Sequence, residues 1–467
     1  MHSAVGRAVK RGIATLRGRF TVATRGLGVL LLLVNAVSLA ARADDWPQWL
    51  GPRRDGVWRE RGIVERLDGD AVRVRWRAPV ALGYAGPAVA GGRVFVMDYV
   101  LREGKIQNNP GARDQLDGAE RVLCFDAADG RLIWKHEYDR PYHISFGGGP
   151  RATVTVDGDR IYALGAEGNL WCLRAADGSV EWAKDFAKDY GAETPFWGHA
   201  AHPLVDGDAL YCLVGGKGSV AVAFDKATGR ELWRALDASQ QGYCPPTMIE
   251  QGGRKTLLVW HAEALCALDP TSGAPRWSVE LQPAYGMAIA APRQRGDLVF
   301  ASGYGDAAVL LRLGASGAAP QVLWRGGAKK ALYSTNATPH FDDGVIYGCD
   351  AATGALMAIA PDDGRRLWQT TEPTLGATGR GRYGTAFLVR NEDRYFLMSE
   401  TGELILARLK PDGYAELGRA KLIEPTNEVF GRKVLWSHPA FSDRGIFVRN
   451  DNELIRADLA VDDSTAP

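Results

Sequence analysis

Aromatic and polar residues recur at eight places in the sequence, each directly before a short apolar run that predicts a β-strand. The residues there that could contact a ligand are Tyr84, His143, Arg151, Trp197, His199, Tyr243, Tyr285, Asn336, Arg382, Tyr383, Trp436 and His438. Apolar pockets with a few convergent polar groups are the usual small-molecule sites of proteins. We therefore expect a funnel for a planar or anionic ligand, with Arg151 and Arg382 as its charge partners. The alternative, that the rings only wedge neighbouring sheets apart, stays open.

Motifs that would identify a metal site, a nucleotide site or a catalytic nucleophile are weak or missing in this sequence. His199 and His202 could supply two ligands to a metal ion, but no further ligand follows at a recognisable spacing, so we predict no metal site. The glycines of residues 379–384 match the G-x-G-x-x-G dinucleotide pattern, which functions only between a strand and a helix. Here the pattern leads into a predicted strand. No Gly-x-Ser-x-Gly motif is present, and we assign no catalytic residue.

The cysteines predict buried thiols rather than disulfides. Cys124, Cys172 and Cys266 occupy equivalent places in the repeats, within apolar runs that predict β-strands. Equivalent positions in neighbouring repeats lie too far apart for the short Cα–Cα distance of a disulfide. We therefore expect them to act as small hydrophobic residues.

Charge and hydropathy limit the partners and the compartment. The 56 basic residues almost balance the 55 acidic residues, which argues against a nucleic-acid surface. In residues 1–43, six basic residues precede a short apolar run and an Ala-Arg-Ala site, which is typical of a cleaved secretory signal. A membrane anchor is the alternative, although the run is short and contains Asn35. We expect an exported, periplasmic monomer without a transmembrane span; its final compartment stays open, as does the identity of its small ligand or protein partner.

A repeat that ends in tryptophan must position all these residues. The tryptophans are spaced 44 to 58 residues apart; they are Trp76, Trp134, Trp182, Trp233, Trp277, Trp324 and Trp368. A turn of the Asp-x-x-x-Gly type precedes Trp134, Trp233 and Trp277, and similar turns that end in Asp-Gly precede Trp182 and Trp368. Each period also contains two or three short β-rich runs with Asp-Gly turns between them, which are hairpin signals. Four antiparallel strands per period, repeated around an axis, are the pattern of a β-propeller. We expect each tryptophan to pack between neighbouring blades.

The count of repeats predicts an all-β, eight-bladed propeller of four-stranded antiparallel blades over residues 73–459. The last repeat supplies only three strands, so we expect the N-terminal strand around Trp76 to complete it, which removes an exposed sheet edge. Seven blades stay an alternative, because the seventh repeat lacks its tryptophan. Residues 44–72 form an N-terminal extension, and residues 460–467 form a tail. The polar insertion 98–121 predicts a surface loop on the first blade.

The repeat resembles that of PQQ-binding quinoproteins. Its core reads D-A-x-x-G-x-x-x-W, and the segments Trp46-Pro-Gln-Trp49 and Gly51-Pro-Arg-Arg-Asp55-Gly56 are similar to the leader of exported bacterial PQQ-like propellers, often described as BamB-like. The resemblance covers about residues 44 to 459. It implies the fold directly, whereas one fold hosts many functions.

The resemblance implies two different activities. One branch of the family comprises dehydrogenases that use PQQ with calcium and an acidic base, and often adjacent cysteines; no adjacent cysteines occur here, and no acidic residue matches the base. We therefore expect a non-catalytic binding scaffold, with no assigned cofactor. A PQQ-dependent alcohol or sugar dehydrogenase, with PQQ and calcium as cofactors, is the alternative. The aromatic residues alone also suggest polysaccharide binding.

Overall fold

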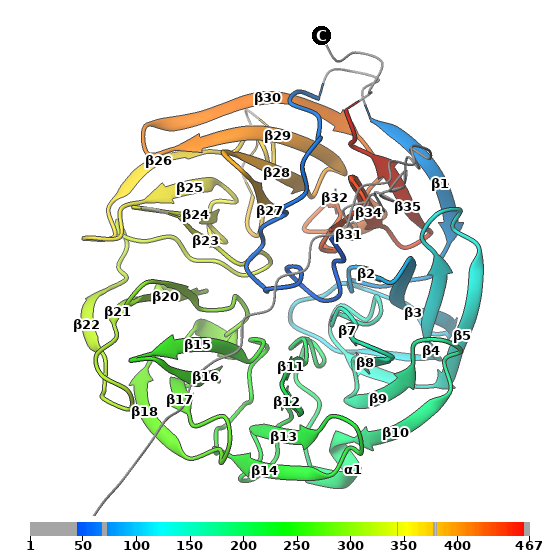
Figure 1. The fold of residues 1–467 in the computed structure, drawn as a ribbon, viewed down its shortest axis with the longest axis horizontal. Helices are drawn as coiled ribbons and strands as arrows, with labels where there is room; N and C mark the ends of the chain where they lie inside the picture. The colour runs from blue at the N-terminus through cyan, green and yellow to red at the C-terminus, as the bar shows by residue number, and fades with distance from the viewer. Residues whose placement is uncertain (1–43, 68–71, 343, 377–378, 380, 462–467) are drawn as a thin grey trace, which may run out of the picture. The chain divides into compact units, whose positions relative to one another are not determined.

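The chain folds into a ring of β-sheets around a central axis (Figure 1). The structure is a computed structural model that describes residues 44–67, 72–342, 344–376, 379 and 381–461; the predicted secretory signal lies outside these residues. Within the described ranges the strands form eight antiparallel sheets of four strands, one of which carries a fifth, and a separate two-stranded hairpin. The prediction of an all-β, eight-bladed propeller is therefore confirmed.

The first four blades follow one another along the chain. They consist of β2 (Ala88–Ala90), β3 (Arg93–Glu103), β4 (Asp114–Asp126) and β5 (Leu132–Asp139); β7 (Thr155–Asp157), β8 (Arg160–Leu164), β9 (Asn169–Arg174) and β10 (Val180–Asp185); β11 (Leu204–Asp206), β12 (Ala209–Leu213), β13 (Ala221–Asp225) and β14 (Glu231–Ala235); and β15 (Thr247–Gln251), β16 (Arg254–Trp260), β17 (Ala264–Leu268) and β18 (Pro275–Glu280). The fifth strand of the first sheet is β6 (Tyr142–Ile144), which pairs with β4.

The remaining blades continue the same order. They consist of β19 (Arg293–Arg295), β20 (Leu298–Gly303), β21 (Ala307–Arg312) and β22 (Gln321–Arg325); β23 (His340–Asp342), β24 (Val345–Cys349), β25 (Leu356–Ile359) and β26 (Arg366–Thr370); β27 (Ala386–Asn391), β28 (Arg394–Ser399), β29 (Glu403–Lys410) and β30 (Gly413–Lys421); and β33 (Ala440–Ser442), β34 (Gly445–Arg449), β35 (Glu453–Asp458) and β1 (Arg73–Pro79). The connections also contain the helix α1 (Phe186–Tyr190), the 3-10 turn η2 (Ala284–Gly286) and the hairpin of β31 (Asn427–Val429) and β32 (Arg432–Val434).

The two ends of the propeller share the eighth blade. β1 pairs antiparallel with β35, so that Arg73 lies opposite Asp458 and Pro79 lies opposite Glu453. The Arg77 guanidinium reinforces this pairing with a contact of 2.8 Å to Glu453. The predicted closure by the N-terminal strand is therefore present.

Six of the seven repeat tryptophans donate a hydrogen bond from the indole to a backbone carbonyl of the next blade, whereas Trp277 donates to Gln251 of its own blade. The indole Nε1 of Trp76 donates to the carbonyl of Ala127 at 3.0 Å, and Trp134 makes the same bond to Ala175 at 3.1 Å. The glycine of the next blade's turn leaves room for the ring: a Cβ on Gly130 would lie 2.6 Å from Trp76. The tryptophan and glycine of the repeat are thus two halves of one contact between neighbouring blades.

The N-terminal extension crosses the centre of the ring (the dark blue segment in Figure 1). Trp46 exchanges backbone hydrogen bonds of 2.8 and 2.9 Å with Val89 of the first blade, and Trp58 donates at 2.8 Å to the carbonyl of Arg390 in the seventh. Between them, the carbonyl of Arg54 accepts a bond of 2.9 Å from Arg293 in the fifth blade. These contacts hold the extension against the inner strands, where it lies across one end of the central channel.

The insertion at residues 98–121 differs from its prediction. Most of it extends β3 and β4 into the longest hairpin of the described chain, and only residues 104–113 form the connecting loop. Asp98 and Tyr99 are fully buried, and Asp98 accepts bonds of 2.8 and 2.6 Å from Arg121. A surface loop was the wrong interpretation, because pairing with Arg121 allows the polar Asp98 to be buried within a strand.

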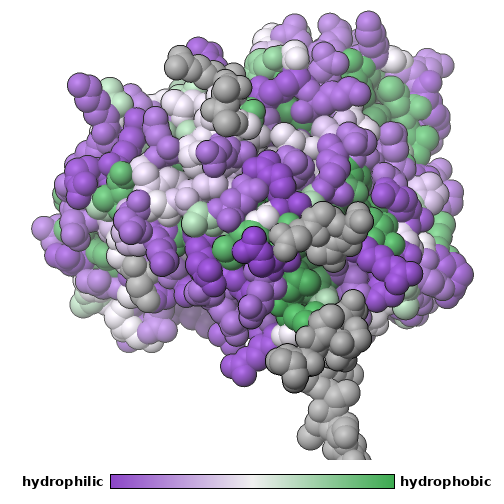
Figure 2. Space-filling model, turned by 90° about the horizontal axis from the view of Figure 1, so that it is seen from above, coloured by the Kyte–Doolittle hydropathy of each residue, from purple (hydrophilic) through white to green (hydrophobic). Residues whose placement is uncertain are grey.

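The cysteine thiols are buried, and most of the surface in view is hydrophilic (Figure 2). All six cysteines are free and buried, which confirms that they do not form disulfides. Hydrophilic residues cover most of the side shown in Figure 2, with hydrophobic residues in small patches between them. Of the helices in the described ranges, none has the length and apolar character that crossing a membrane would require.

Candidate functional site

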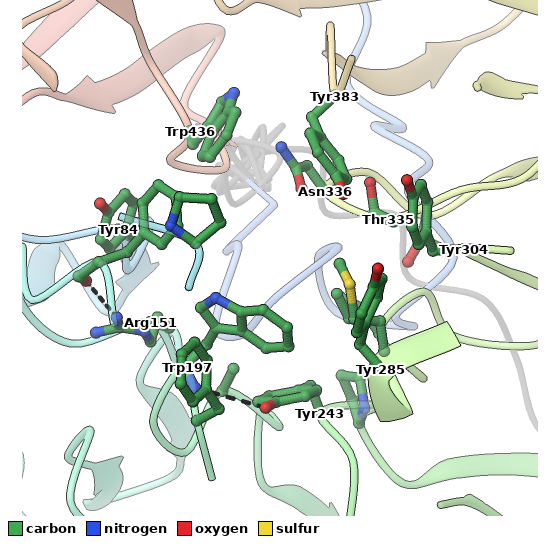
Figure 3. Close-up of a pocket in the computed structure, with 18 of the residues that line it drawn as sticks. Tyr84, Arg151, Trp197, Tyr243, Tyr285, Tyr304, Thr335, Asn336, Tyr383 and Trp436 are labelled. Atoms are coloured by element: carbon green, nitrogen blue, oxygen red, sulfur yellow. Dashed lines mark hydrogen bonds between the residues drawn. The ribbon is translucent and has the colours of Figure 1, made fainter. Parts of the chain in front are cut away.

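A cavity of about 770 Å³ lies on the axis of the ring. Its walls come mainly from the connections that lead into the innermost strand of each blade, and Figure 3 shows the labelled side chains placed around it. Its aromatic residues are Trp49, Tyr84, Phe146, Phe196, Trp197, Tyr243, Tyr285, Tyr304, Tyr383, Phe430 and Trp436. A cavity of this size, mostly aromatic with few polar groups, has the properties of a small-molecule site.

The structure brings together ten of the twelve predicted residues. Those that line the cavity are Tyr84, Arg151, Trp197, Tyr243, Tyr285, Asn336, Arg382, Tyr383, Trp436 and His438. His143 does not line it: it is exposed on β6, between the buried Tyr142 and Ile144. His199 also lies outside, where its ring packs edge-on against Phe186 at 5.4 Å. These are locations, and the ligand-binding role of the ten residues remains a prediction.

The extension forms the floor of the cavity. Trp49 is 4% exposed and stacks on His202, with ring centroids 4.7 Å apart and an interplanar angle of 14°. His438 meets the same indole edge-on at 5.9 Å. The Arg54 guanidinium lies 5.4 Å from the centroid of the Trp49 ring and donates at 2.9 Å to the carbonyl of Pro203. The cavity therefore ends in an indole and two imidazoles.

Both floor histidines are neutral at physiological pH. Burial lowers the pKa of His438 to about 3. Burial and the neighbouring His438 and Arg54 hold the pKa of His202 well below its usual range. The Nδ1 atom of His202 accepts a hydrogen bond of 2.8 Å from the backbone N–H of Thr153, which leaves the proton on Nε2. Because Nδ1 is occupied and His199 lies elsewhere, the two histidines of residues 199–202 do not form a pair of metal ligands.

One wall of the cavity is a continuous series of four rings. Tyr285 and Tyr304 stack with centroids 6.3 Å apart, Tyr304 lies 5.5 Å from Tyr383, and Tyr383 stacks on Phe430 at 5.5 Å. The three tyrosines lie together on one side of Figure 3, and Tyr84 with Arg151 lies on the other. The series offers a flat ligand more aromatic surface than any single ring could.

Several of these aromatic residues have an unusual backbone conformation. Phe146, Tyr285, Tyr383 and Phe430 have φ angles of 53°, 59°, 61° and 51°. Bulky residues rarely adopt this left-handed region, which is unfavourable for them and recurs where a binding site dictates the position of a side chain. Tyr285 is nevertheless 75% exposed and Phe430 is 49% exposed, so packing within the chain does not explain their conformation.

The charged groups of the cavity are cationic. Arg151 donates to the carbonyls of Ser145, Phe146 and Gly149, and its guanidinium lies 5.2 Å from the Tyr84 ring centroid. Arg382 is exposed at the mouth. Neither guanidinium forms an ion pair with a carboxylate of the described residues. No Asp or Glu lines the cavity within the described part of the chain.

A buried carboxylate supports the wall from behind. Glu400 accepts hydrogen bonds from Arg432 at 2.6 Å, from the indole of Trp436 at 3.1 Å and from the backbone of Thr385 at 3.1 Å. Arg432 in turn donates at 2.8 Å to the carbonyl of Arg382. Burial raises the pKa of the Glu400 carboxyl above its usual value. The carboxylate thus positions two cavity residues but does not face the cavity itself.

The lining residues do not fit PQQ held with calcium. Calcium takes six to eight oxygen ligands, among which carboxylates dominate. No carboxylate is found among the described residues that line the cavity. The described residues also contain no group of three or more His, Cys, Asp or Glu side chains that could hold a metal ion. A carboxylate base within reach of a substrate is missing from the lining as well. We derive no reaction step through this cofactor.

Three aromatic lining residues lie outside the eight sequence segments that predicted the site. Trp49 belongs to the extension, Tyr304 lies in the hairpin between β20 and β21, and Phe430 lies in the hairpin of β31 and β32. None of them directly precedes an innermost strand, which is the position that identified the others. The segment Trp46-Pro-Gln-Trp49 was noted only for the family resemblance, which gave no position for the Trp49 ring.

Comparison with solved structures shows the same fold at low identity. BamB from Moraxella catarrhalis is 14% identical, with a TM-score of 0.54 over 83% of this chain and 97% of that chain. The quinohemoprotein alcohol dehydrogenase ADHIIG from Pseudomonas putida HK5 is 12% identical, with a TM-score of 0.55 over 90% of this chain and 81% of that chain. Among curated proteins, none matches the sequence.

A family model identifies the repeat itself. The model described as outer membrane protein assembly factor BamB matches residues 118–370, which is more than half of the chain. The matched segment runs from within β4 of the first blade to the end of β26 in the sixth. The chain therefore belongs to this family of PQQ-like β-propeller proteins.

Proposed function

We propose that the protein is a non-catalytic binding propeller that takes a small ligand into its axial cavity. The observation that carries this proposal is the composition of the lining, which is aromatic on all sides and contains no carboxylate in the described residues. Aromatic rings supply a large contact area for a ligand. Among the described residues, the lining offers no carboxylate that could act as a general base or bind a calcium ion.

The proposal includes export. The signal pattern of residues 1–43 supports it, and the family model that matches carries the name of an outer-membrane assembly factor. A protein in the periplasm would meet its ligand directly, without uptake into the cytoplasm.

Binding can be tested with N-phenyl-1-naphthylamine, a neutral dye that becomes fluorescent in apolar surroundings. We expect the purified chain to bind one dye molecule, and Tyr304→Ala to weaken binding about tenfold, because it interrupts the aromatic wall. His143→Ala is the control, since His143 lies outside the cavity. Equal dye affinity in the wild type and Tyr304→Ala would place binding elsewhere and contradict the proposal.

The absence of catalysis needs its own test. The chain is incubated with PQQ and calcium, desalted, and examined for quinone absorbance and for dye reduction with alcohols and sugars. We expect neither. Retained quinone together with turnover would overturn the non-catalytic assignment and favour a PQQ-dependent dehydrogenase.

A further inference from the structure

The cavity has a charged end and a neutral end. At the mouth, Arg382 is exposed and its guanidinium has no hydrogen-bond or ion-pair partner among the described residues. Arg151, on the opposite wall, donates only to carbonyl oxygens, which leave its positive charge unneutralised. The electrostatic potential at the cavity walls is therefore positive, and it attracts anions.

The floor cannot accommodate a charged group. Trp49, His202 and His438 meet there, and both imidazoles are neutral. Removing an ion from water is expensive unless a counter-charge and hydrogen bonds replace its hydration. An ionised ligand group would find an exposed guanidinium without a partner at Arg382, whereas the Arg54 guanidinium near Trp49 does not line the cavity and donates to the carbonyl of Pro203. A charged ligand therefore binds with its apolar part inward.

The exposed rings at the mouth favour a flat ligand body. Tyr285 and Phe430 both have left-handed backbone conformations, and both leave much of their ring surface in water. A flat ring system placed against the wall from Tyr285 to Phe430 would cover this surface. Apolar burial of this kind contributes roughly 25 cal/mol for each Å² removed from water.

A cation is the competing occupant, because aromatic cages also bind quaternary ammonium groups. The cavity differs from a cage for cations in its fixed charges: Arg151 and Arg382 line it, and Arg54 lies behind the floor. No carboxylate of the described residues lines the cavity to offset these three guanidiniums. The fixed charges therefore disfavour a cation.

We infer that the ligand is an amphiphilic aromatic anion, whose flat apolar body lies between the aromatic walls above Trp49 and whose acid group stays at the mouth beside Arg382. The inference rests on the proposed binding function and adds the ligand's chemical class and orientation. Carboxylates, sulfonates and sulfates share the required chemistry.

Two dyes with the same ring system separate charge from shape. N-phenyl-1-naphthylamine is neutral, and 8-anilinonaphthalene-1-sulfonate adds one sulfonate. We expect the sulfonate to bind the full mature chain about fivefold more tightly, the upper range for an ion pair in contact with solvent. Raising the salt concentration to about 0.5 M should reduce this difference, because salt screens exposed charges.

The variant Arg382→Gln tests the orientation. It should remove the preference for the sulfonate, so that the two dyes bind this variant with equal affinity. Arg230→Gln is the matched control, since Arg230 is an exposed arginine in the turn between β13 and β14 and does not line the cavity. An unchanged circular dichroism spectrum and thermal transition establish that both variants are folded.

The outcomes distinguish this inference from the function on which it rests. Equal affinities for the two dyes, or an Arg382→Gln variant that keeps the preference for the sulfonate, would overturn the anion assignment while the binding function stands. Stronger competition by phenyltrimethylammonium than by benzoate would also overturn it, in favour of a cation. If Tyr304→Ala alters the affinity of neither dye, the inference and the binding function both fail.

Discussion

The indole Nε1 of Trp436 donates a hydrogen bond of 3.1 Å to the carboxylate of Glu400, a residue that is only 1% exposed. The same carboxylate binds Arg432, which holds the carbonyl of Arg382. A single acidic side chain therefore fixes one ring of the cavity wall and the backbone of the arginine at the mouth. The connection joins the seventh blade, which carries Glu400, to the segment that leads into the eighth.

Replacing Glu400 should damage stability and binding together. Glu400→Ala leaves Arg432 and the Trp436 indole without their acceptor, and we expect the free energy of unfolding to fall by about 3 kcal/mol. The affinity for N-phenyl-1-naphthylamine should fall as well, because Trp436 loses its fixed position. Urea denaturation and dye titration measure the two effects. Glu424→Ala is the control, because its carboxylate is 79% exposed and pairs only with Lys421; equal losses in the two variants would contradict the prediction.

The buried histidines predict that stability falls in acid. Burial lowers the pKa values of His199 and His438 to about 3, whereas an unfolded histidine titrates near pH 6.5. Their contribution is therefore fully present above pH 6.5 and is lost as the pH falls from 6.5 towards 3. Each histidine should remove about 1.4 kcal/mol per pH unit within that window.

Urea denaturation at pH 7, 6 and 5 measures this loss. In His438→Gln the free energy of unfolding should depend less steeply on pH, by the contribution of one histidine. The variant has no imidazole at this position to protonate on unfolding. His143→Gln, at an exposed position on β6, is the matched control for the substitution itself. A slope that His438→Gln does not alter would show that its imidazole is not held neutral in the folded chain.

The contact between Trp76 and Gly130 provides a test of how the ring closes. In Gly130→Ala the new Cβ would lie 2.6 Å from the indole, and the residue has a φ of +75°. We expect a loss of about 1–3 kcal/mol from overpacking, in addition to the cost of the backbone conformation. Gly158→Ala is a matched control, since φ there is +60° and nothing lies within 4 Å of the new Cβ. Equal free energies of unfolding for the two variants would mean that Trp76 does not press on the first blade.

The fold was predictable because residues close together in the sequence identify each repeat. A turn that contains glycine and a tryptophan in the fourth strand recur in most repeats, and they form the same contact between blades wherever the turn glycine meets an indole. Pairing between strands that are far apart in the sequence was harder to predict. For the strand that contains Trp76, the missing fourth strand of the last repeat indicated the partner.

The site was less predictable, because its parts depend on long-range packing. Position before an innermost strand identified Tyr243 and Trp436, but Trp49 reaches the cavity only because the extension crosses the ring. His143 lies outside the cavity, on β6, where the strand pairs with the extended β4 and the His143 side chain is exposed. Left-handed backbone angles such as that of Tyr285 leave no mark in a single sequence.

Tyr285 offers the most direct test of whether the aromatic mouth is built for a ligand. Its φ of 59° is unfavourable for a residue with a side chain, and its ring is 75% exposed, so the chain gains little from it in the absence of a ligand. Tyr285→Gly removes the steric conflict, and the greater freedom of glycine in the unfolded chain offsets part of that gain. We expect the free energy of unfolding to rise by about 0.5 kcal/mol.

The same substitution should weaken dye binding about fivefold, because one end of the aromatic wall is lost. Glu392→Gly serves as the control: its φ is 53°, it lies in the turn between β27 and β28, and it does not line the cavity. That variant should gain stability by a similar amount and bind the dye as the wild type does. A Tyr285→Gly chain that is less stable than the wild type would show that the ring supports the fold. One that binds the dye normally would remove Tyr285 from the site. Only the combination of higher stability and weaker binding fits a side chain that the fold holds in an unfavourable conformation for the sake of a ligand.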